Sequence, residues 1–188
     1  IQGASRTIVA GNSLSSNVRG VICEHSASYN NISGNTILDN SSSGIALAYG
    51  VTNCLIQGNN VNTARATDFG SGEALLQIYV GCSYNQVIGN SVNCSTATFP
   101  NQFGLYCGVD SPHNSFQGNT VKGTYTRACI AVESGWNSAT PETASYAYAK
   151  GAAVNGYESI TTQEITLSDN LVDSAAAVPA IYLGQQGQ

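Results

Sequence analysis

Apolar and polar positions recur along the chain in six units that share one pattern. Each unit has a Gly-Asn pair, or Asp-Asn in the last unit. Counted from the first residue of the pair, one apolar residue lies two positions before it and another lies three positions after it. The pairs are Gly11-Asn12, Gly34-Asn35, Gly58-Asn59, Gly89-Asn90, Gly118-Asn119 and Asp169-Asn170. Apolar residues on both sides of a polar turn indicate two short strands joined by a bend. Their repetition indicates a solenoid.

A third strand completes each unit. Two apolar residues spaced by two positions follow every pair, and this alternation is typical of a strand with one buried face. In four successive units the first of them lies 13 residues before the next Gly, whereas its distance from the preceding pair varies. This pattern indicates coils of about 22 to 24 residues, stacked at ~4.8 Å, with insertions at one corner. We expect the first inward positions of this strand at Val21, Ile45, Leu76, Leu105, Cys129 and Ile181.

The pattern resembles the right-handed parallel β-helix repeat family, the pectate-lyase-like superfamily of pectate lyases, polygalacturonases, alginate epimerases and phage tailspikes. The resemblance implies an all-β fold, a right-handed single-stranded parallel β-helix of about six coils with three short strands each. It also implies an Asn ladder, at a corner whose left-handed backbone Asn tolerates, formed by Asn12, Asn35, Asn59, Asn90, Asn119 and Asn170. The consensus of leucine-rich repeats, whose period is similar, is absent.

We expect residues 1–188 to form a single β-helix domain with an insertion loop at about 134–159. Neither end of the chain shows a polar cap or an amphipathic capping helix. An uncapped solenoid exposes strand edges that invite association. The chain is therefore interpreted as a fragment of a longer protein, or as one covered by missing flanks or sister chains.

Composition narrows the class of partner. Charged residues make up 9% of the chain and the net charge is -5, which disfavours nucleic acid because phosphate binding needs clustered Lys and Arg. No apolar run approaches the ~18 residues of a membrane span, so we expect no membrane insertion. Cys23, Cys107 and Cys129 align with apolar positions of other coils, which favours buried free thiols over disulfides. Without a Cys-x-x-Cys pair and with two His, no metal or other cofactor is expected.

Segments outside the repeating frame, at residues 62–74, 93–103 and about 134–159, would flank the outward face of the third strand and form a groove. In the fifth coil we expect Ile130 and Val132 to face outward. Aromatic rings with polar tips suit sugar rings. The predicted substrate-binding residues are Tyr79, Tyr106, Gln77, Trp136 and His113. The competing interpretation of Tyr79 and Tyr106 is that Tyr is simply a good strand residue.

Acidic residues near this groove suggest glycoside hydrolysis, which needs two carboxyl groups at about 5 to 9.5 Å. Asp110 and Glu133, expected at the end of the same strand on consecutive coils, are the first predicted catalytic pair, and Glu73 and Asp68 are the second. A solvated surface carboxylate is the competing interpretation for each of the four.

A polysaccharide lyase or uronate epimerase is the weaker alternative. The segment Asp110-Ser111-Pro112-His113 resembles the Asp-Pro-His signature of mannuronan epimerases but departs from it at the inserted Ser111. A lyase also needs a cation for the uronate carboxylate, and no Lys or Arg clearly lines the groove. Polygalacturonase motifs and the calcium carboxylate clusters of pectate lyases are missing as well.

The sequence therefore predicts recognition and cleavage of a bacterial surface or other complex polysaccharide by a tailspike-like β-helix, outside the cell or on a virion surface. Because tailspikes act as trimers, the resemblance implies a homotrimer for the full-length protein. The rival is a non-catalytic carbohydrate-binding or structural fibre segment. An ice-binding solenoid is disfavoured, since no outward Thr-x-Thr ladder is present.

Overall fold

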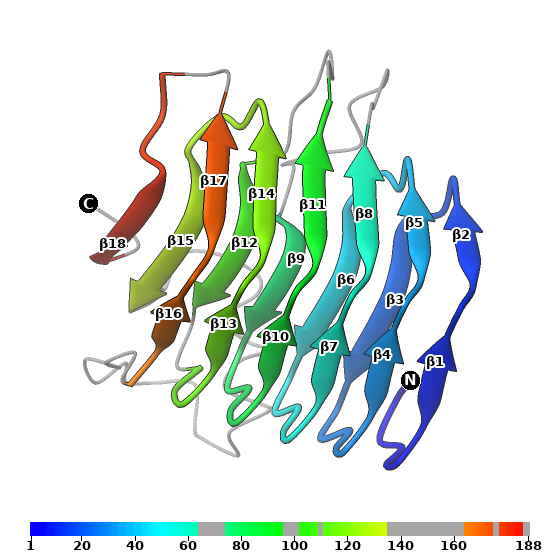
Figure 1. The fold of residues 1–188 in the computed structure, drawn as a ribbon. Coiled ribbons are helices and arrows are strands. Elements are labelled where there is room, and N and C mark those ends of the chain that lie inside the picture. The colour runs from blue at the N-terminus through cyan, green and yellow to red at the C-terminus, as the bar shows by residue number, and fades with distance from the viewer. Residues whose placement is uncertain (64–73, 96–101, 109–110, 135–163, 175–176, 186–188) are drawn as a thin grey trace.

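The computed structural model of the chain describes residues 1–63, 74–95, 102–108, 111–134, 164–174 and 177–185. All regular structure in these residues is β-strand, and they contain no helix long and apolar enough to cross a membrane. The strands follow one another in threes, and each set of three makes one coil. Figure 1 shows the coils running in order from one end of the molecule to the other.

Three parallel sheets of six strands run along the molecule, each taking one strand from every coil. The first sheet contains β1 (Ile8–Ala10), β4 (Asn31–Ser33), β7 (Leu55–Gln57), β10 (Gln86–Ile88), β13 (Ser115–Gln117) and β16 (Thr166–Ser168). The second contains β2 (Ser13–Ser15), β5 (Thr36–Leu38), β8 (Asn60–Thr63), β11 (Ser91–Cys94), β14 (Thr120–Gly123) and β17 (Leu171–Ser174). The third contains β3 (Arg19–Glu24), β6 (Ser43–Ala48), β9 (Ala74–Tyr79), β12 (Phe103–Gly108), β15 (Ala128–Ser134) and β18 (Ile181–Gln185). The predicted parallel β-helix of six three-stranded coils is confirmed.

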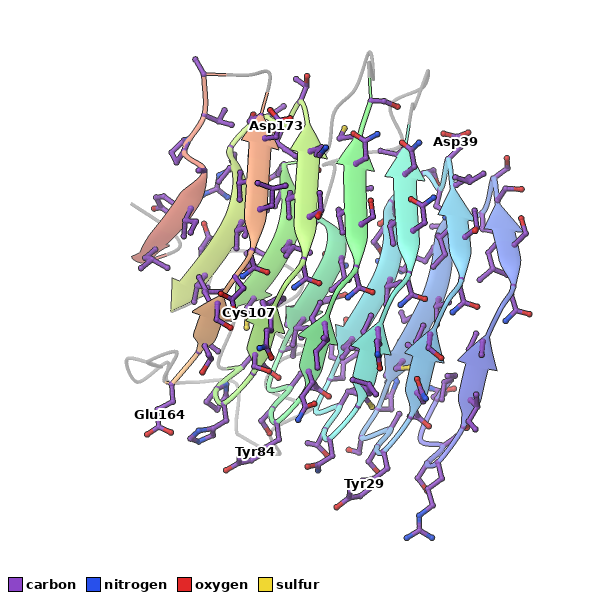
Figure 2. The ribbon with its side chains drawn as sticks, in the orientation of Figure 1. Tyr29, Asp39, Tyr84, Cys107, Glu164 and Asp173 are labelled. Carbon is purple, nitrogen blue, oxygen red and sulfur yellow. The ribbon has the colours of Figure 1, made fainter. Side chains whose placement is uncertain are left out.

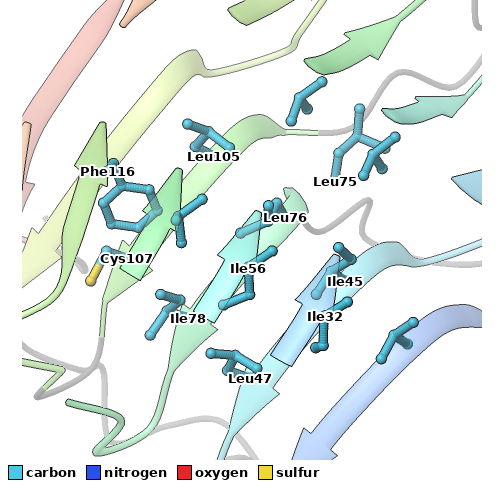
Figure 3. Packing of buried hydrophobic residues seen from close by; sticks show 14 of the residues in the cluster. Ile32, Ile45, Leu47, Ile56, Leu75, Leu76, Ile78, Leu105, Cys107 and Phe116 are labelled. Carbon is cyan, nitrogen blue, oxygen red and sulfur yellow. The ribbon is translucent and has the colours of Figure 1, made fainter. Parts of the chain in front are cut away.

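The core lies inside the coils, where the inward side chains of the three sheets meet (Figure 3). Ile32 and Ile56 are in register on the first sheet, and both are fully buried. Ile45 and Leu76 are likewise in register on the third sheet, and both are fully buried. Each such side chain contributes about 1.5 to 3 kcal/mol by leaving water. Apolar columns in register therefore hold each coil to the next.

The fifth coil differs from the sequence prediction by one residue. Ile130 pairs with Leu105, and Val132 pairs with Cys107, whose side chains belong to the inward columns. Ile130 and Val132 therefore lie in the inward register, not on the outward face as expected.

The inward residues expected for this coil, Cys129 and Ala131, each precede by one residue the positions that pair with Leu105 and Cys107. Ala131 pairs with Tyr106 in the outward register, so its expected inward position is wrong, whereas Cys129 does lie in the core, one residue before Ile130. The segment Ala-Cys-Ile-Ala-Val is apolar in both phases, so alternation could not choose between them. The correct register places Glu133 on the outward face.

The Asn ladder is confirmed over all six coils. In each step the Nδ2 of one Asn donates to the Oδ1 of the next at 2.9 to 3.0 Å, through Asn12, Asn35, Asn59, Asn90, Asn119 and Asn170. The expected left-handed conformation of these Asn is wrong, because the left-handed residue is the one before them. Its φ is 61 to 68° where it is Gly, and 55° at Asp169. In five of the six coils a residue without Cβ takes this left-handed position, and the Asn that follows it bridges the coils.

A second ladder, not predicted from the sequence, runs just before the first sheet. Thr7 N donates to Asn30 Oδ1 at 2.8 Å, and Asn85 Nδ2 donates to Asn114 Oδ1 at 3.0 Å. In the third coil the same position is Cys54, whose amide donates to Asn85 Oδ1 at 2.9 Å. Two rows of amides therefore brace the first sheet, one at each end of its strands.

All six cysteines are free and buried, which confirms the thiols expected at Cys23, Cys107 and Cys129. Burial raises the pKa of the Cys23 and Cys82 thiols to about 12. It also raises the pKa of Cys107. The folded chain thus keeps these thiols protonated in a pH range where the unfolded chain ionises them.

This difference predicts a loss of stability in alkali. Because the folded pKa values of Cys23 and Cys82 are raised, their contribution is complete below the ordinary value of 9.0 and is lost as pH rises towards about 12. We expect the free energy of unfolding to fall by about 1.4 kcal/mol per pH unit for each thiol in this window. Urea unfolding between pH 8 and 10.5 measures it. The double variant Cys23→Ala/Cys82→Ala should show a shallower slope, and an equal slope would contradict the assignment.

Candidate functional site

The outward side chains of the third sheet form the candidate site. Gln77 lies beside Tyr106 on the next coil, and Tyr79 and Glu133 flank Gly108 in the neighbouring register position. Four predicted site residues, Gln77, Tyr79, Tyr106 and Glu133, therefore lie together on one face of one sheet. Three of them are buried although they face outward, with exposed fractions of 4% for Gln77, 8% for Tyr106 and 0% for Glu133.

Tyr106 and Glu133 are joined through the space above Gly108. The Tyr106 hydroxyl occupies the place that a Cβ at position 108 would need, and Glu133 is the neighbour of Gly108 on the following coil. Burial, and then the adjacent Glu133 carboxylate to which the hydroxyl is hydrogen-bonded, raise the pKa of Tyr106 well above its ordinary value. The hydroxyl therefore stays protonated and acts as a donor to Glu133.

Arg127 completes this group, and the sequence prediction missed it. Its Nη2 donates to Glu133 Oε1 at 2.8 Å, and its guanidinium lies 4.9 Å from the centre of the Phe103 ring. The Phe103 ring in turn stacks on Tyr106 with centroids 5.1 Å apart. The expectation that no Lys or Arg lines this face is thus wrong. Because Glu133 already engages the guanidinium, Arg127 is not poised to neutralise a uronate.

The ion pair predicts unequal effects of removing its two members. Arg127→Ala removes the guanidinium that pairs with the fully buried Glu133 carboxylate. It should lower the free energy of unfolding by about 2 kcal/mol, below the value for a fully buried pair because Arg127 is 43% exposed. Glu133→Gln keeps an acceptor for Arg127 and should cost less than about 1 kcal/mol. Chemical denaturation of both variants measures the difference. Equal losses would contradict the pairing.

An aromatic strip, formed by His25, Tyr49 and Tyr79, borders the same face across three coils. The ring centroids are 5.3 Å apart between His25 and Tyr49 and 6.2 Å apart between Tyr49 and Tyr79. His25 and Tyr49 directly follow β3 and β6 in left-handed conformations, with φ of 56 and 58°, whereas Tyr79 ends β9. His25 is exposed and the two tyrosines are half-buried. The strip thus presents rings that a ligand in solution can reach.

The described part of the third sheet does not itself bring two carboxylates to glycosidase distance. Its outward acids are Glu24 and Glu133, which lie in one register position four coils apart, or ~19 Å at the parallel strand spacing. The predicted partners Asp110, Glu73 and Asp68 and the predicted sugar-stacking Trp136 lie outside the described residues. So does the insertion expected at about 134–159, apart from Ser134 at the end of β15. Both catalytic pairs therefore stay predictions.

His113 lies away from this face, in the turn before β13. Its Nδ1 lies 2.8 Å from Glu164 Oε2, and its ring stacks on Tyr84 with centroids 4.7 Å apart and planes at 9°. The structure therefore does not join His113 to the other predicted substrate-binding residues.

Comparison with known proteins gives a family and a fold. The family model described as "NosD: Periplasmic copper-binding protein (NosD)" matches residues 1–157. The solved Streptococcus pneumoniae surface protein and adhesin PfbA is similar to 96% of this chain at 11% identity, with a TM-score of 0.56. The chain spans 49% of the PfbA structure. No curated protein sequence matches the chain.

The residues of this chain do not fit the copper site that the family description implies. Copper prefers Cys, Met and His ligands, and the chain has no Met and two His. His25 and His113 lie in turns three coils apart, and burial keeps the pKa of Cys23 and Cys82 high enough to disfavour the thiolates that bind the metal. Within the described ranges, no three His, Cys, Asp or Glu side chains come together at a metal-binding distance.

Proposed function

As the chain belongs to the NosD family, we propose that it serves as a β-helical binding domain whose ligand is a polysaccharide. The observation that carries this proposal is the aromatic strip, His25, Tyr49 and Tyr79, on the rim of the third sheet. Aromatic rings stack on the C–H faces of sugars while their polar tips bond hydroxyls. The strip runs from coil to coil, so an extended glycan lying along the solenoid meets one ring after another.

The charge of the chain supports the same ligand class. With 9% charged residues, the surface offers neutral hydrogen-bonding groups, which suit a hydroxyl-rich polymer better than a charged one. A location outside the cell or on a virion surface, and a trimeric full-length protein, are parts of this proposal. The words "periplasmic" and "surface protein" in the names of the similar proteins agree with an extracytoplasmic place.

Cleavage of the bound glycan by a glycoside hydrolase mechanism is the second candidate. The observation that favours it is the Glu133 carboxylate, held by Arg127 and Tyr106 on the face that the strip borders. Asp110 would supply the second carboxyl group. Glu133 is fully buried, however, and would reach a substrate only if its neighbours moved. Binding without cleavage is therefore the first candidate.

Glycan binding can be tested on an array of bacterial capsular polysaccharides, O-antigens and plant and algal polysaccharides. We expect selective binding, weakened about 10-fold by Tyr79→Ala because a stacked ring contributes about 0.5 to 1.5 kcal/mol beyond its buried area. Tyr79→Phe keeps the ring and should retain most of the affinity. Undiminished binding by Tyr79→Ala, or no binding to any glycan, would contradict the proposal. New reducing ends that disappear in Glu133→Gln would support cleavage.

A further inference from the structure

A second row of side chains occupies the end of the turn that leads into the first sheet. This turn column has one residue per coil: Arg6, Tyr29, Asn53, Tyr84, His113 and Glu164. All six have left-handed conformations with φ between 55 and 59°. Tyr29 N donates to Thr52 O at 3.1 Å and Asn53 N donates to Ser83 O at 3.2 Å, so the turns stack in register. Backbone geometry therefore aims successive side chains the same way.

Where adjacent members of the turn column are both flat, they stack. The Tyr84 and His113 rings lie 4.7 Å apart and nearly parallel, which matches the ~4.8 Å between coils. Glu164, on the next coil, contacts the Nδ1 atom of the same His113 ring. Figure 2 shows Tyr29, Tyr84 and Glu164 projecting from the same edge of the solenoid. The column thus behaves as a ladder of side chains that continues outside the core.

One member of the turn column, Asn53, has a short side chain between two tyrosines. Asn53 lies between Tyr29 and Tyr84, whose side chains are 61% and 57% exposed. These tyrosines are two coils apart, about 10 Å, which is twice the stacking distance. Two coil spacings leave room for one ring between the two tyrosine positions, beside the short and exposed Asn53 side chain. We infer that Tyr29 and Tyr84 sandwich a single pyranose residue above the Asn53 amide.

The chemistry of the gap favours a sugar. A pyranose offers C–H groups to the ring faces, and its hydroxyls can pair with the donor and acceptor of the Asn53 amide. The net charge of -5 disfavours a nucleotide, because its phosphates would be repelled. The gap lies at the opposite end of its turn from the aromatic strip, and buried Ala27 and Val51 lie between the two ends. It does not depend on the proposed function, so either can fail without the other.

The site can be tested with methyl β-D-glucopyranoside, methyl β-D-galactopyranoside and methyl α-D-mannopyranoside as probes, on protein labelled with 3-fluorotyrosine. We expect at least one of them to shift the Tyr29 and Tyr84 ¹⁹F signals with a Kd of about 1 to 10 mM, typical of one ring. Asn53→Tyr fills the gap with a third ring and should weaken binding at least about 10-fold, equivalent to 1.4 kcal/mol.

Tyr29→Asn and Tyr84→Asn should weaken binding to a similar extent. Both introduce the residue that this turn already carries at Asn53, so the fold should be kept, as circular dichroism would verify. Tyr79→Ala, in the aromatic strip, should leave these shifts unchanged and separates the two sites. Unshifted signals with all three glycosides, or full binding by Asn53→Tyr, would overturn the inference. Shifts with adenosine alone would overturn the pyranose assignment in favour of a planar aromatic ligand.

Discussion

Replacing Asn90 with alanine should lower the free energy of unfolding by about 3 to 5 kcal/mol, because it leaves several buried polar groups without partners at about 1 to 3 kcal/mol each. Asn90 is 1% exposed. Its Nδ2 donates to Asn119 Oδ1 and Ile56 O, each at 3.0 Å. Its Oδ1 accepts from the amide and the Nδ2 of Asn59, each at 2.9 Å. The truncation therefore breaks the ladder in both directions at the middle of the solenoid.

Asn12→Ala is the matched control, since Asn12 is the exposed first member of the same ladder. Water can replace its partners, so the loss should stay below about 1 kcal/mol. Urea unfolding followed by circular dichroism measures both variants. Equal losses at Asn12 and Asn90 would show that burial of the ladder does not contribute to stability.

Gly123→Ala should lower the free energy of unfolding by about 3 kcal/mol or more, through strain and overpacking together. Gly123 has a φ of 105°, which L side chains rarely adopt. A Cβ there would lie 2.7 Å from the carbonyl carbon and 2.9 Å from the amide nitrogen of Cys94. Cys94 pairs with Gly123 between β11 and β14, and its carbonyl accepts from Thr124 N at 2.9 Å. The clash is with backbone already fixed by the sheet, so it cannot relax cheaply.

Gly89→Ala is the control variant, because it introduces a side chain at a left-handed residue without causing a clash. Gly89 has a φ of 61°, but a Cβ there would meet nothing within 4 Å. The equivalent residue of the last coil is Asp169, so this turn accepts a side chain. We expect a loss of about 1 to 2 kcal/mol for Gly89→Ala. A thermal or urea midpoint for Gly123→Ala as high as that of Gly89→Ala would contradict the close approach of β11 and β14.

Most of the fold follows from the sequence because stacking repeats one physical requirement in every coil. Ile32 lies over Ile56, and Asn35 over Asn59, so the same residue types recur at the same spacing. The predicted register failed in the fifth coil, where the repeated spacing and the alternation of apolar residues were less clear. In the fifth coil an insertion hid the 13-residue spacing, and apolar residues in both phases hid the alternation. The error moved Ile130 and Val132 outward.

The candidate site was only partly accessible to sequence reasoning. Alternation along a strand identified Gln77, Tyr79 and Tyr106, whose directions follow from the pleat. Arg127 precedes β15, in the coil whose register was misjudged. Tyr49 lies in a turn, where the left-handed backbone sets the direction of the side chain. No period of two extends into such turns, so the aromatic strip and the turn column emerged only from the structure.

The most direct test of glycan binding is a crystal structure of the chain soaked with an oligosaccharide of a polysaccharide that the array identifies. The account predicts sugar density along the solenoid axis, with pyranose faces against Tyr49 and Tyr79 on the rim of the third sheet. An oligosaccharide bound with high occupancy only elsewhere on the molecule, with no sugar against either ring, would contradict it.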